Sequence, residues 1–309
     1  FRSKALHRLI GFAGFAPPAL CVALMGNCRC KMYKDSEHAK FEEATAANSR
    51  EDPNLLRKER PPVTFDNGST YTGQWLGGTR NGKGTQVWPD GGRYTGQFAN
   101  NQAEGHGKIV HADGDTYEGE WMADKAHGTG TYKHKDGSVY TGQWARHKQH
   151  GEGLETWPDG TEYRGQYKDG AKNGAGTFLW MEGSVYEGQF IDNDFYGEGV
   201  CTWADGRKYV GQWISSKMHG KGEFTWRDGQ KYRGSYVDDQ KSGEGVFTWP
   251  DGHQYVGQWR HGKQHGVGTY TDGTDEPREA EWAGGTRIRW LTAEESGDLL
   301  ADAPSSQSW

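Results

Sequence analysis

Tyr71-Thr72-Gly73-Gln74-Trp75, Gly82-Lys83-Gly84 and Trp88-Pro89-Asp90-Gly91 are three segments of one motif that returns every 23 residues along this 309-residue chain. Each copy begins with a tyrosine, which is followed by glycine at the second position and by an aromatic residue at the fourth. The nine tyrosines are Tyr71, Tyr94, Tyr117, Tyr140, Tyr163, Tyr186, Tyr209, Tyr232 and Tyr255. A constant period in this range indicates a repeat array, in which each repeat buries its surface only against its neighbours.

Each repeat is predicted to form a β-hairpin. Period-2 alternation places the tyrosine, the glycine and the aromatic residue of Tyr71 to Trp75 on one face of a strand, and a second strand is predicted from Gly82 onward. We expect a polar loop from Leu76 to Asn81 between the two strands. A tighter turn is predicted at Trp88-Pro89-Asp90-Gly91, because Pro presets the first turn angle, Asp bonds its own backbone and Gly accepts a left-handed conformation.

The Gly-x-Gly pairs of the nine copies need a physical reason, because glycine usually weakens a strand. We expect both glycines to give clearance to the aromatic rings of a neighbouring strand. The sequence therefore predicts an all-β fold: an elongated, single-layer, twisted antiparallel sheet of nine consecutive 23-residue hairpins with a short C-terminal cap. One face would be aromatic and the other rich in Thr, Gln, Lys and Glu. A mean hydropathy of -0.98 is too low for a conventional two-layer core, and 48 glycines suit a single layer.

The motif resembles the MORN (membrane occupation and recognition nexus) repeat from about Asn67 to Gly273. The copies depart from the repeat pattern at a few positions, where we expect the fold to survive: Phe98, Tyr167, Phe190 and Tyr236 replace the strand Trp, His111 and His134 replace the second Trp, and Glu182 replaces the turn Asp. The resemblance implies a non-enzymatic scaffold or adaptor at a membrane, the cytoskeleton or a cilium. Two alternatives it leaves open are a regulatory fragment of a phosphatidylinositol phosphate kinase-like protein and a module that binds phospholipid directly.

Four segments are predicted: residues 1–24 as an apolar leader or a segment upstream of the true start, 25–62 as an N-terminal anchor with a charged linker or helix, 63–290 as the repeat array, and 291–309 as a C-terminal helix or tail. With Met25 as the start, Gly26 is a candidate for N-myristoylation, and Cys28 and Cys30 are candidates for palmitoylation. One myristoyl chain binds a membrane only reversibly, so the second acyl chain would make attachment stable. The alternative is that Met25-Gly26 is internal and the cysteines are incidental.

We find no catalytic, cofactor or metal site in the sequence. The turn aspartates and the glycine pairs recur with the repeat, which favours a structural role over acid–base chemistry or phosphate binding. Four histidines hold one repeat position and allow at most weak metal binding in a row: His127, His150, His219 and His265. The net charge of -6, with both signs interleaved, argues against nucleic-acid binding.

The aromatic face is predicted to form a groove for a protein partner, with a helix as its natural occupant, either a partner's helix or the chain's own C-terminal one. The groove residues are predicted to be Tyr117, Trp121, Tyr140, Trp144, Tyr163, Trp180, Tyr186, Trp203, Tyr209, Trp213 and Trp226. Exposed strands at the array ends predict a homodimer. The expected location is the cytosolic face of a membrane, the cytoskeleton or a cilium. Anionic phospholipid is a further candidate ligand, bound by Lys83, Lys108, Lys221 and Arg233.

Overall fold

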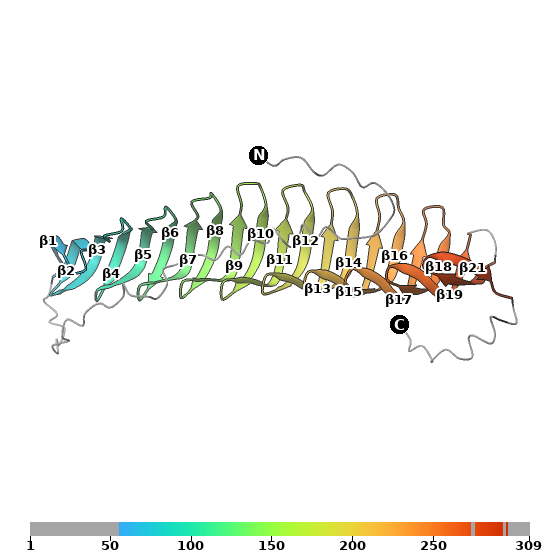
Figure 1. The fold of residues 1–309 in the computed structure, drawn as a ribbon. Coiled ribbons are helices and arrows are strands. Elements are labelled where there is room, and N and C mark those ends of the chain that lie inside the picture. The colour runs from blue at the N-terminus through green and yellow to red at the C-terminus, as the bar shows by residue number, and fades with distance from the viewer. Residues whose placement is uncertain (1–55, 273–275, 293–294, 296–309) are drawn as a thin grey trace. The chain divides into compact units, whose positions relative to one another are not determined.

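The computed structural model describes residues 56–272, 276–292 and 295, and the described regular structure consists of β-strands apart from Glu295, which is helical (Figure 1). All strand pairings are antiparallel, as expected for a chain of hairpins. The strands are β1 (Lys58–Thr64), β2 (Thr70–Leu76), β3 (Thr79–Val87), β4 (Arg93–Ala99), β5 (Gln102–Val110), β6 (Thr116–Met122), β7 (Lys125–Lys133), β8 (Val139–Ala145), β9 (Lys148–Thr156), β10 (Glu162–Lys168), β11 (Ala171–Leu179), β12 (Val185–Ile191), β13 (Asp194–Thr202), β14 (Lys208–Ile214), β15 (Lys217–Thr225), β16 (Lys231–Val237), β17 (Gln240–Thr248), β18 (Gln254–Arg260), β19 (Lys263–Thr271), β20 (Arg278–Ala283) and β21 (Thr286–Trp290).

The chain divides into two compact units. Among the described residues, the N-terminal unit runs to Asp194 and contains β1 to β12, and the C-terminal unit runs from Phe195 and holds the strands from β13 onward. Within each unit every strand pairs with the strands that precede and follow it in the chain. The predicted all-β repeat of hairpins is therefore confirmed.

A single layer of aromatic rings forms the core of each unit. We call the side of the sheet that carries these rings the ring face and the opposite side the polar face. In the first repeat, Tyr71 is fully buried and packs edge to face on Trp75 and Phe98, with ring centroids 5.2 and 5.1 Å apart. Its hydroxyl donates a hydrogen bond to the backbone oxygen of Gln74 at 2.9 Å. Each tyrosine thus links its own hairpin to the next one.

The two glycines of each pair serve different purposes, which corrects our expectation that both give clearance to a ring. A Cβ on Gly84 would collide with the hydroxyl and ring of Tyr71 on the neighbouring strand, so the expectation is confirmed there. Gly82 instead adopts φ +102° at the β-bulge that shifts the β2–β3 register, and it faces the Gln74 side chain. A left-handed bulge residue favours glycine for its backbone freedom.

The turn inside each hairpin is shorter than predicted. The Leu76 to Asn81 loop is a two-residue turn, because β3 already begins at Thr79. In most other copies both turn residues have positive φ, as in Asn100 and Asn101 at 48° and 71°. This is the type I′ geometry that matches the twist of paired strands.

Each hairpin turn is also hydrogen-bonded to the preceding hairpin. The amide of Asn101 donates to the Arg80 carbonyl oxygen at 3.1 Å, and the Asn101 side-chain oxygen accepts from the Arg80 amide at 2.8 Å. The same 21-residue spacing recurs with Asp124 on Ala103 in the N-terminal unit and Asp239 on Met218 in the C-terminal unit. The polar residue at the second turn position therefore fixes the stacking of successive hairpins.

The connections between hairpins are the longer ones, which corrects the prediction that they are the tighter turns. Five residues, 88–92, separate β3 from β4, and they are closed by a hydrogen bond from the Trp88 amide to the Gly92 oxygen at 2.9 Å. The expected role of the turn aspartate is confirmed, because Asp90 Oδ1 accepts the Gly92 amide at 2.9 Å.

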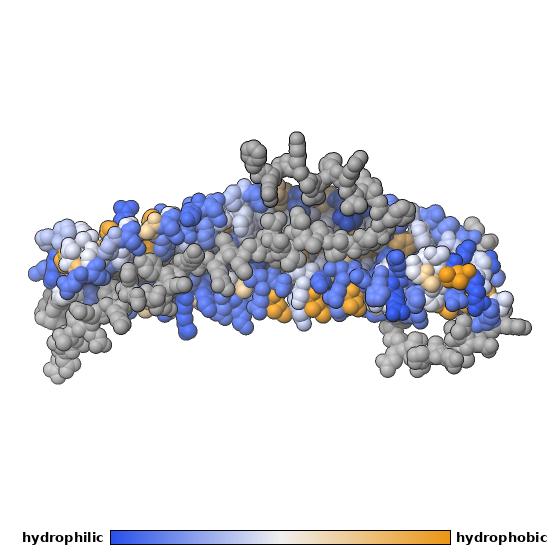
Figure 2. Space-filling view, viewed as in Figure 1, coloured by the Kyte–Doolittle hydropathy of each residue, from blue (hydrophilic) through white to orange (hydrophobic). Residues whose placement is uncertain are grey.

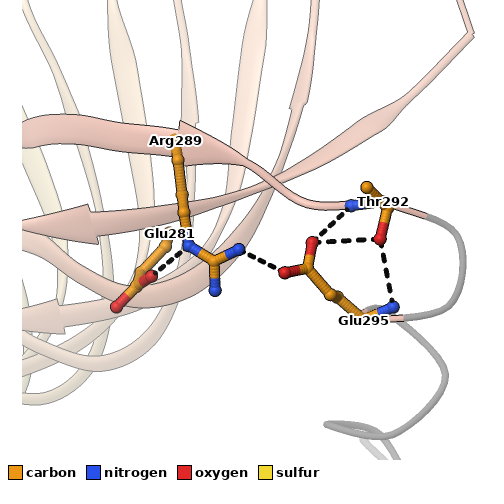
Figure 3. Close-up of polar contacts among 4 residues, drawn as sticks. All are labelled: Glu281, Arg289, Thr292 and Glu295. Atoms are coloured by element: carbon orange, nitrogen blue, oxygen red, sulfur yellow. Dashed lines mark hydrogen bonds and ion pairs between the residues drawn. The ribbon is translucent and has the colours of Figure 1, made fainter.

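The ends of the array differ from its centre. The strand β1 contains Pro61-Pro62, so the boundary predicted at residue 62 falls inside a strand. After the ninth repeat, the strands β20 and β21 form a closing hairpin, where the sequence predicted a short C-terminal cap. Beyond them, Thr292 and Glu295 exchange the reciprocal hydrogen bonds of a helix capping box, and Arg289 joins Glu295 to Glu281 (Figure 3). The pKa of Glu295 is lowered to about 2, mainly by the hydrogen bond from the Thr292 backbone amide and next by the hydrogen bond from the Arg289 side chain. Of the predicted helix, only Glu295 lies within the described residues, and it is helical.

Candidate functional site

Most of the rings predicted to line a groove are packed inside the sheet. Nine of the eleven side chains are buried, and Trp203 and Trp226 are half-buried. The nine buried residues are Tyr117, Trp121, Tyr140, Trp144, Tyr163, Trp180, Tyr186, Tyr209 and Trp213. Their contacts are mainly with one another, as in the edge-to-face pair of Tyr117 and Trp144 at 5.1 Å. A partner groove made by these eleven residues therefore stays a prediction.

Other predicted sites are placed as follows. Gly26, Cys28 and Cys30 lie outside the described residues. The four repeated histidines stand on separate strands, and within the described ranges no group of three His, Cys, Asp or Glu residues is arranged to hold a metal ion. Over the same part of the chain, no helix is long and apolar enough to cross a membrane.

Troughs on the polar face are the sites that sequence reasoning missed. The floor of each trough is formed by the second glycine of the Gly-x-Gly pair and by the glycine that follows the repeat tyrosine by two positions, and side chains of adjacent strands form its walls. A trough of about 1220 Å³ in the C-terminal unit crosses β13 to β18, and its lining includes Val210, Glu223, Arg233, Val246 and Val256. Two smaller troughs, of about 570 and 440 Å³, lie at the same repeat positions in the N-terminal unit.

The walls of the troughs differ from copy to copy, whereas the ring face hardly changes. The residue after the tyrosine points to the polar face and reads, in the nine copies, Thr72, Thr95, Glu118, Thr141, Arg164, Glu187, Val210, Arg233 and Val256. Figure 2 shows a surface of mainly hydrophilic residues interrupted by small hydrophobic spots. The exposed valines belong to the C-terminal unit, where Val210 and Val256 are 45% and 44% exposed. One face of the sheet thus specifies the fold, and the other varies in chemistry along the array.

The ammonium group of Lys241 lies among aromatic rings on the ring face of the C-terminal unit. Lys241 Nζ lies 4.4 Å from the ring centroid of Trp259 and 4.9 Å from that of Phe247, and the residue lines a cavity of about 200 Å³. Burial lowers the pKa of Lys241 to about 8. At the same repeat position in the N-terminal unit, Lys172 forms an ion pair with Glu155 at 2.9 Å.

Lys241 should contribute increasing stability to the C-terminal unit between pH 8 and pH 10. The pKa of Lys241 is lower in the folded chain than the ordinary value of 10.5, so the unfolded chain binds more protons at this residue and folding gains from rising pH. We expect Lys241 to contribute a gain of about 2 kcal/mol. Burial raises the pKa of tyrosines such as Tyr232, so their ionisation in the unfolded chain acts in the opposite direction as the pH approaches 10. Denaturant unfolding of the wild type and of Lys241→Met, which copies Met218, separates the two effects, because both proteins share the tyrosines. The stability of the wild type relative to the variant should rise across this window, and a difference that does not change with pH would contradict the assignment.

Comparison with known proteins identifies the repeat. The MORN repeat family model matches nine consecutive segments, at residues 71–93, 94–116, 117–139, 140–162, 163–185, 186–206, 209–231, 232–254 and 255–274. A search of the curated proteins found no match. Similar solved structures include the TCP10 domain of Danio rerio CPAP in complex with a peptide of Danio rerio STIL, at 13% identity over 77% of this chain and 100% of that chain, with a TM-score of 0.41. Another is the SAS-4 (dCPAP) TCP domain in complex with a proline-rich motif of Ana2 (dSTIL) of Drosophila melanogaster, at 13% identity over 69% of this chain and 96% of that chain, with a TM-score of 0.30. These structural likenesses are too weak to inform function. The nine family matches, in contrast, cover most of the hairpins described above, and the chain therefore belongs to the MORN repeat family.

Proposed function

We propose that this protein is a non-enzymatic scaffold or adaptor that binds protein partners on the polar face of its sheet. The observation that carries the proposal is the contrast between the two faces: the ring face repeats one packing scheme, while the trough walls change from repeat to repeat. A surface that varies over a rigid, repeated support can present a different recognition site at each repeat. Shape, charge and apolar contact would then select the partner.

A protein partner fits this face better than an anionic membrane does. Basic side chains on the polar face are interleaved with acids: Lys108 forms an ion pair with Glu118 at 3.1 Å, and Arg233 stands directly opposite Glu223 in register. A phospholipid surface would be met by a cluster of basic residues of one sign. Alternating signs instead provide complementarity to a protein surface of mixed charge.

The proposal is tested on the trough of the N-terminal unit that contains Arg164 and Glu187. Reversing both charges with Arg164→Glu and Glu187→Lys is expected to reduce the captured partners at least fivefold, because both side chains are exposed on the trough wall. Affinity capture from cell extract, quantified by mass spectrometry, gives the measurement. Met181→Ser, at a residue that is 66% exposed in a turn, is the control that should capture the wild-type set. If the wild type, the charge-reversal variant and the Met181→Ser control captured the same set of partners in the same amounts, the polar face would not be the recognition surface.

We further propose a tether at Gly26, with Cys28 and Cys30 as the sites of the second acyl chain, which would hold the scaffold at the cytosolic face of a membrane. The support is the sequence Met25 to Cys30, in which a glycine follows methionine and two cysteines stand two and four residues after that glycine. Metabolic labelling with a myristate analogue should give label in the wild type and none in Gly26→Ala. Equal labelling of both would rule the tether out and would leave a cytoskeletal location as the remaining proposal.

A further inference from the structure

One row of side chains on the polar face of the C-terminal unit is apolar at both ends and carries opposite charges at its two central positions. Direct register pairs connect its members across six strands, from β13 to β18. The row, which we call the symmetric row, consists of Val200, Val210, Glu223, Arg233, Val246 and Val256. Two valines stand at each end, and an acid and a base stand at the centre.

This order makes the row complementary to a second copy of itself. Let two copies face each other across a twofold axis that runs parallel to the strands, between β15 and β16. Glu223 then meets Arg233 of the second copy, Val210 meets Val246, and Val200 meets Val256. A twofold axis across the strands would instead place Glu223 on Glu223, so charge selects the first arrangement. Self-complementarity of this kind is what a twofold interface requires.

A second row of outward positions obeys the same symmetry. In strand order from β13 to β18 it carries Glu198, Gln212, Lys221, Ser235, Glu244 and Gln258, of which Glu198, Lys221 and Glu244 line the trough. About the same axis, Glu198 meets Gln258, Gln212 meets Glu244 and Lys221 meets Ser235. Across these two rows no side chain meets one of like charge.

The central charges are also available to a second copy. Glu223 and Arg233 line the trough and are opposite in register, yet within the described residues they form no ion pair with each other. The N-terminal unit behaves differently at the same repeat positions, where Lys108 and Glu118 are joined at 3.1 Å. There the flanking positions hold threonines, and Thr131 is hydrogen-bonded to its neighbour. That row has no valine to bury.

The face is large enough for a weak dimer. Six strands spaced at about 4.8 Å span about 24 Å, and four outward residues along a strand span about 20 Å. This gives about 500 Å² on each copy, or about 1,000 Å² in total, which is the lower limit for a specific interface. Association in the micromolar range is the corresponding expectation.

We propose that the protein forms an antiparallel, face-to-face homodimer through the polar face of β13 to β18, with the symmetric row at its centre. The homodimer would cover the trough of the C-terminal unit, whereas partner capture is tested on a trough of the N-terminal unit, so either proposal can fail without the other. It also differs from pairing at the array ends, which uses edge strands and none of these side chains.

The experiment is sedimentation of the full chain between about 1 and 200 µM, in which the wild type should show a concentration-dependent dimer. Glu223→Arg alone and Arg233→Glu alone each bring like charges together at the centre and should weaken dimerisation at least tenfold. A mixture of the two variants should associate as a heterodimer with near wild-type affinity, because each then presents the charge that the other needs. The double variant, Glu223→Arg with Arg233→Glu, should dimerise like the wild type.

The control is the matched N-terminal position, Lys108→Glu, which should leave the dimer unchanged. Circular dichroism and thermal unfolding check that each variant is folded, and the mixture supplies an internal check because both components must be native to associate. A monomeric wild type at 200 µM, or a mixture that stays monomeric, would overturn the proposal. Dimers of unchanged affinity in all variants would also overturn it and would point to the strand edges instead.

Discussion

Replacing Gly84 with alanine is expected to lower the free energy of unfolding by about 3 kcal/mol. The added Cβ would collide with the hydroxyl and ring of Tyr71. Tyr71 has nowhere to move, because it is fully buried, packs edge to face on Trp75 and Phe98, and donates to the Gln74 backbone. The cost therefore combines overpacking with the loss of a hydrogen bond and of ring contacts.

Gly78→Ala is the matched control within the same hairpin. A Cβ at Gly78 meets no atom within 4 Å, so we expect a change of about 0.5 kcal/mol or less. Chemical denaturation gives the total effect, and hydrogen exchange of β2 and β3 shows whether the loss is local, as expected for an array whose repeats interact only with their neighbours. Equal losses from the two substitutions would show that ring clearance is not the reason for the glycine pair.

The ring face was predictable because its signal repeats nine times. Tyr71, Gly73 and Trp75 alternate with polar residues, and this alternation alone places them on one face of a strand. The division of labour between Gly82 and Gly84 was not predictable, because a β-bulge is a property of register between two strands. Nothing in the Gly-x-Gly spacing separates a glycine needed for its backbone angle from one needed for its missing side chain.

The turns were assigned in the wrong order of length for a similar reason. Pro89-Asp90-Gly91 is a strong turn signal, and for this reason the tight turn was predicted in the connection between hairpins. The actual two-residue turns contain pairs such as Ala123-Asp124, which lack the Asn-Gly or Asp-Gly signature. What the sequence does show in retrospect is the polar second residue, which bonds to the preceding hairpin and thereby holds a left-handed conformation in place.

The troughs escaped the sequence analysis because their residues come from different strands. Val210 and Glu223 are separated by a turn and a bulge, and only the observed register sets them side by side. The signal that would have found them is the comparison of copies: positions that stay constant belong to the core, and outward positions that vary belong to the surface. The aromatic residues were predicted to form the binding groove instead, although most of them are buried in the packing of the sheet.

A buried ion pair in the N-terminal unit interrupts the ring core. Glu155 and Lys172 are only 2% and 4% exposed, their charged atoms lie 2.9 Å apart, and the Tyr167 hydroxyl donates to the same carboxylate oxygen at 2.9 Å. At the same repeat positions the C-terminal unit holds Cys201 and Met218, which are both buried. The fold therefore accepts either an ion pair or an apolar pair at this place, but each partner depends on the other.

Glu155→Cys alone should lower the free energy of unfolding by about 3 to 5 kcal/mol, because it leaves a buried ammonium group without its carboxylate. Adding Lys172→Met, which copies the apolar pair, should recover all but about 1 kcal/mol of that loss when Tyr167→Phe also removes the orphaned hydroxyl. Phe190 already occupies the repeat position of Tyr167, so the ring itself is tolerated. Denaturant unfolding of Glu155→Cys, of Lys172→Met and of their double variant gives the coupling energy, and the triple variant shows the effect of the hydroxyl. If the single and triple variants lost the same stability, the ion pair would be two independent polar contacts, and desolvation of an isolated charge could not be the cause of the loss.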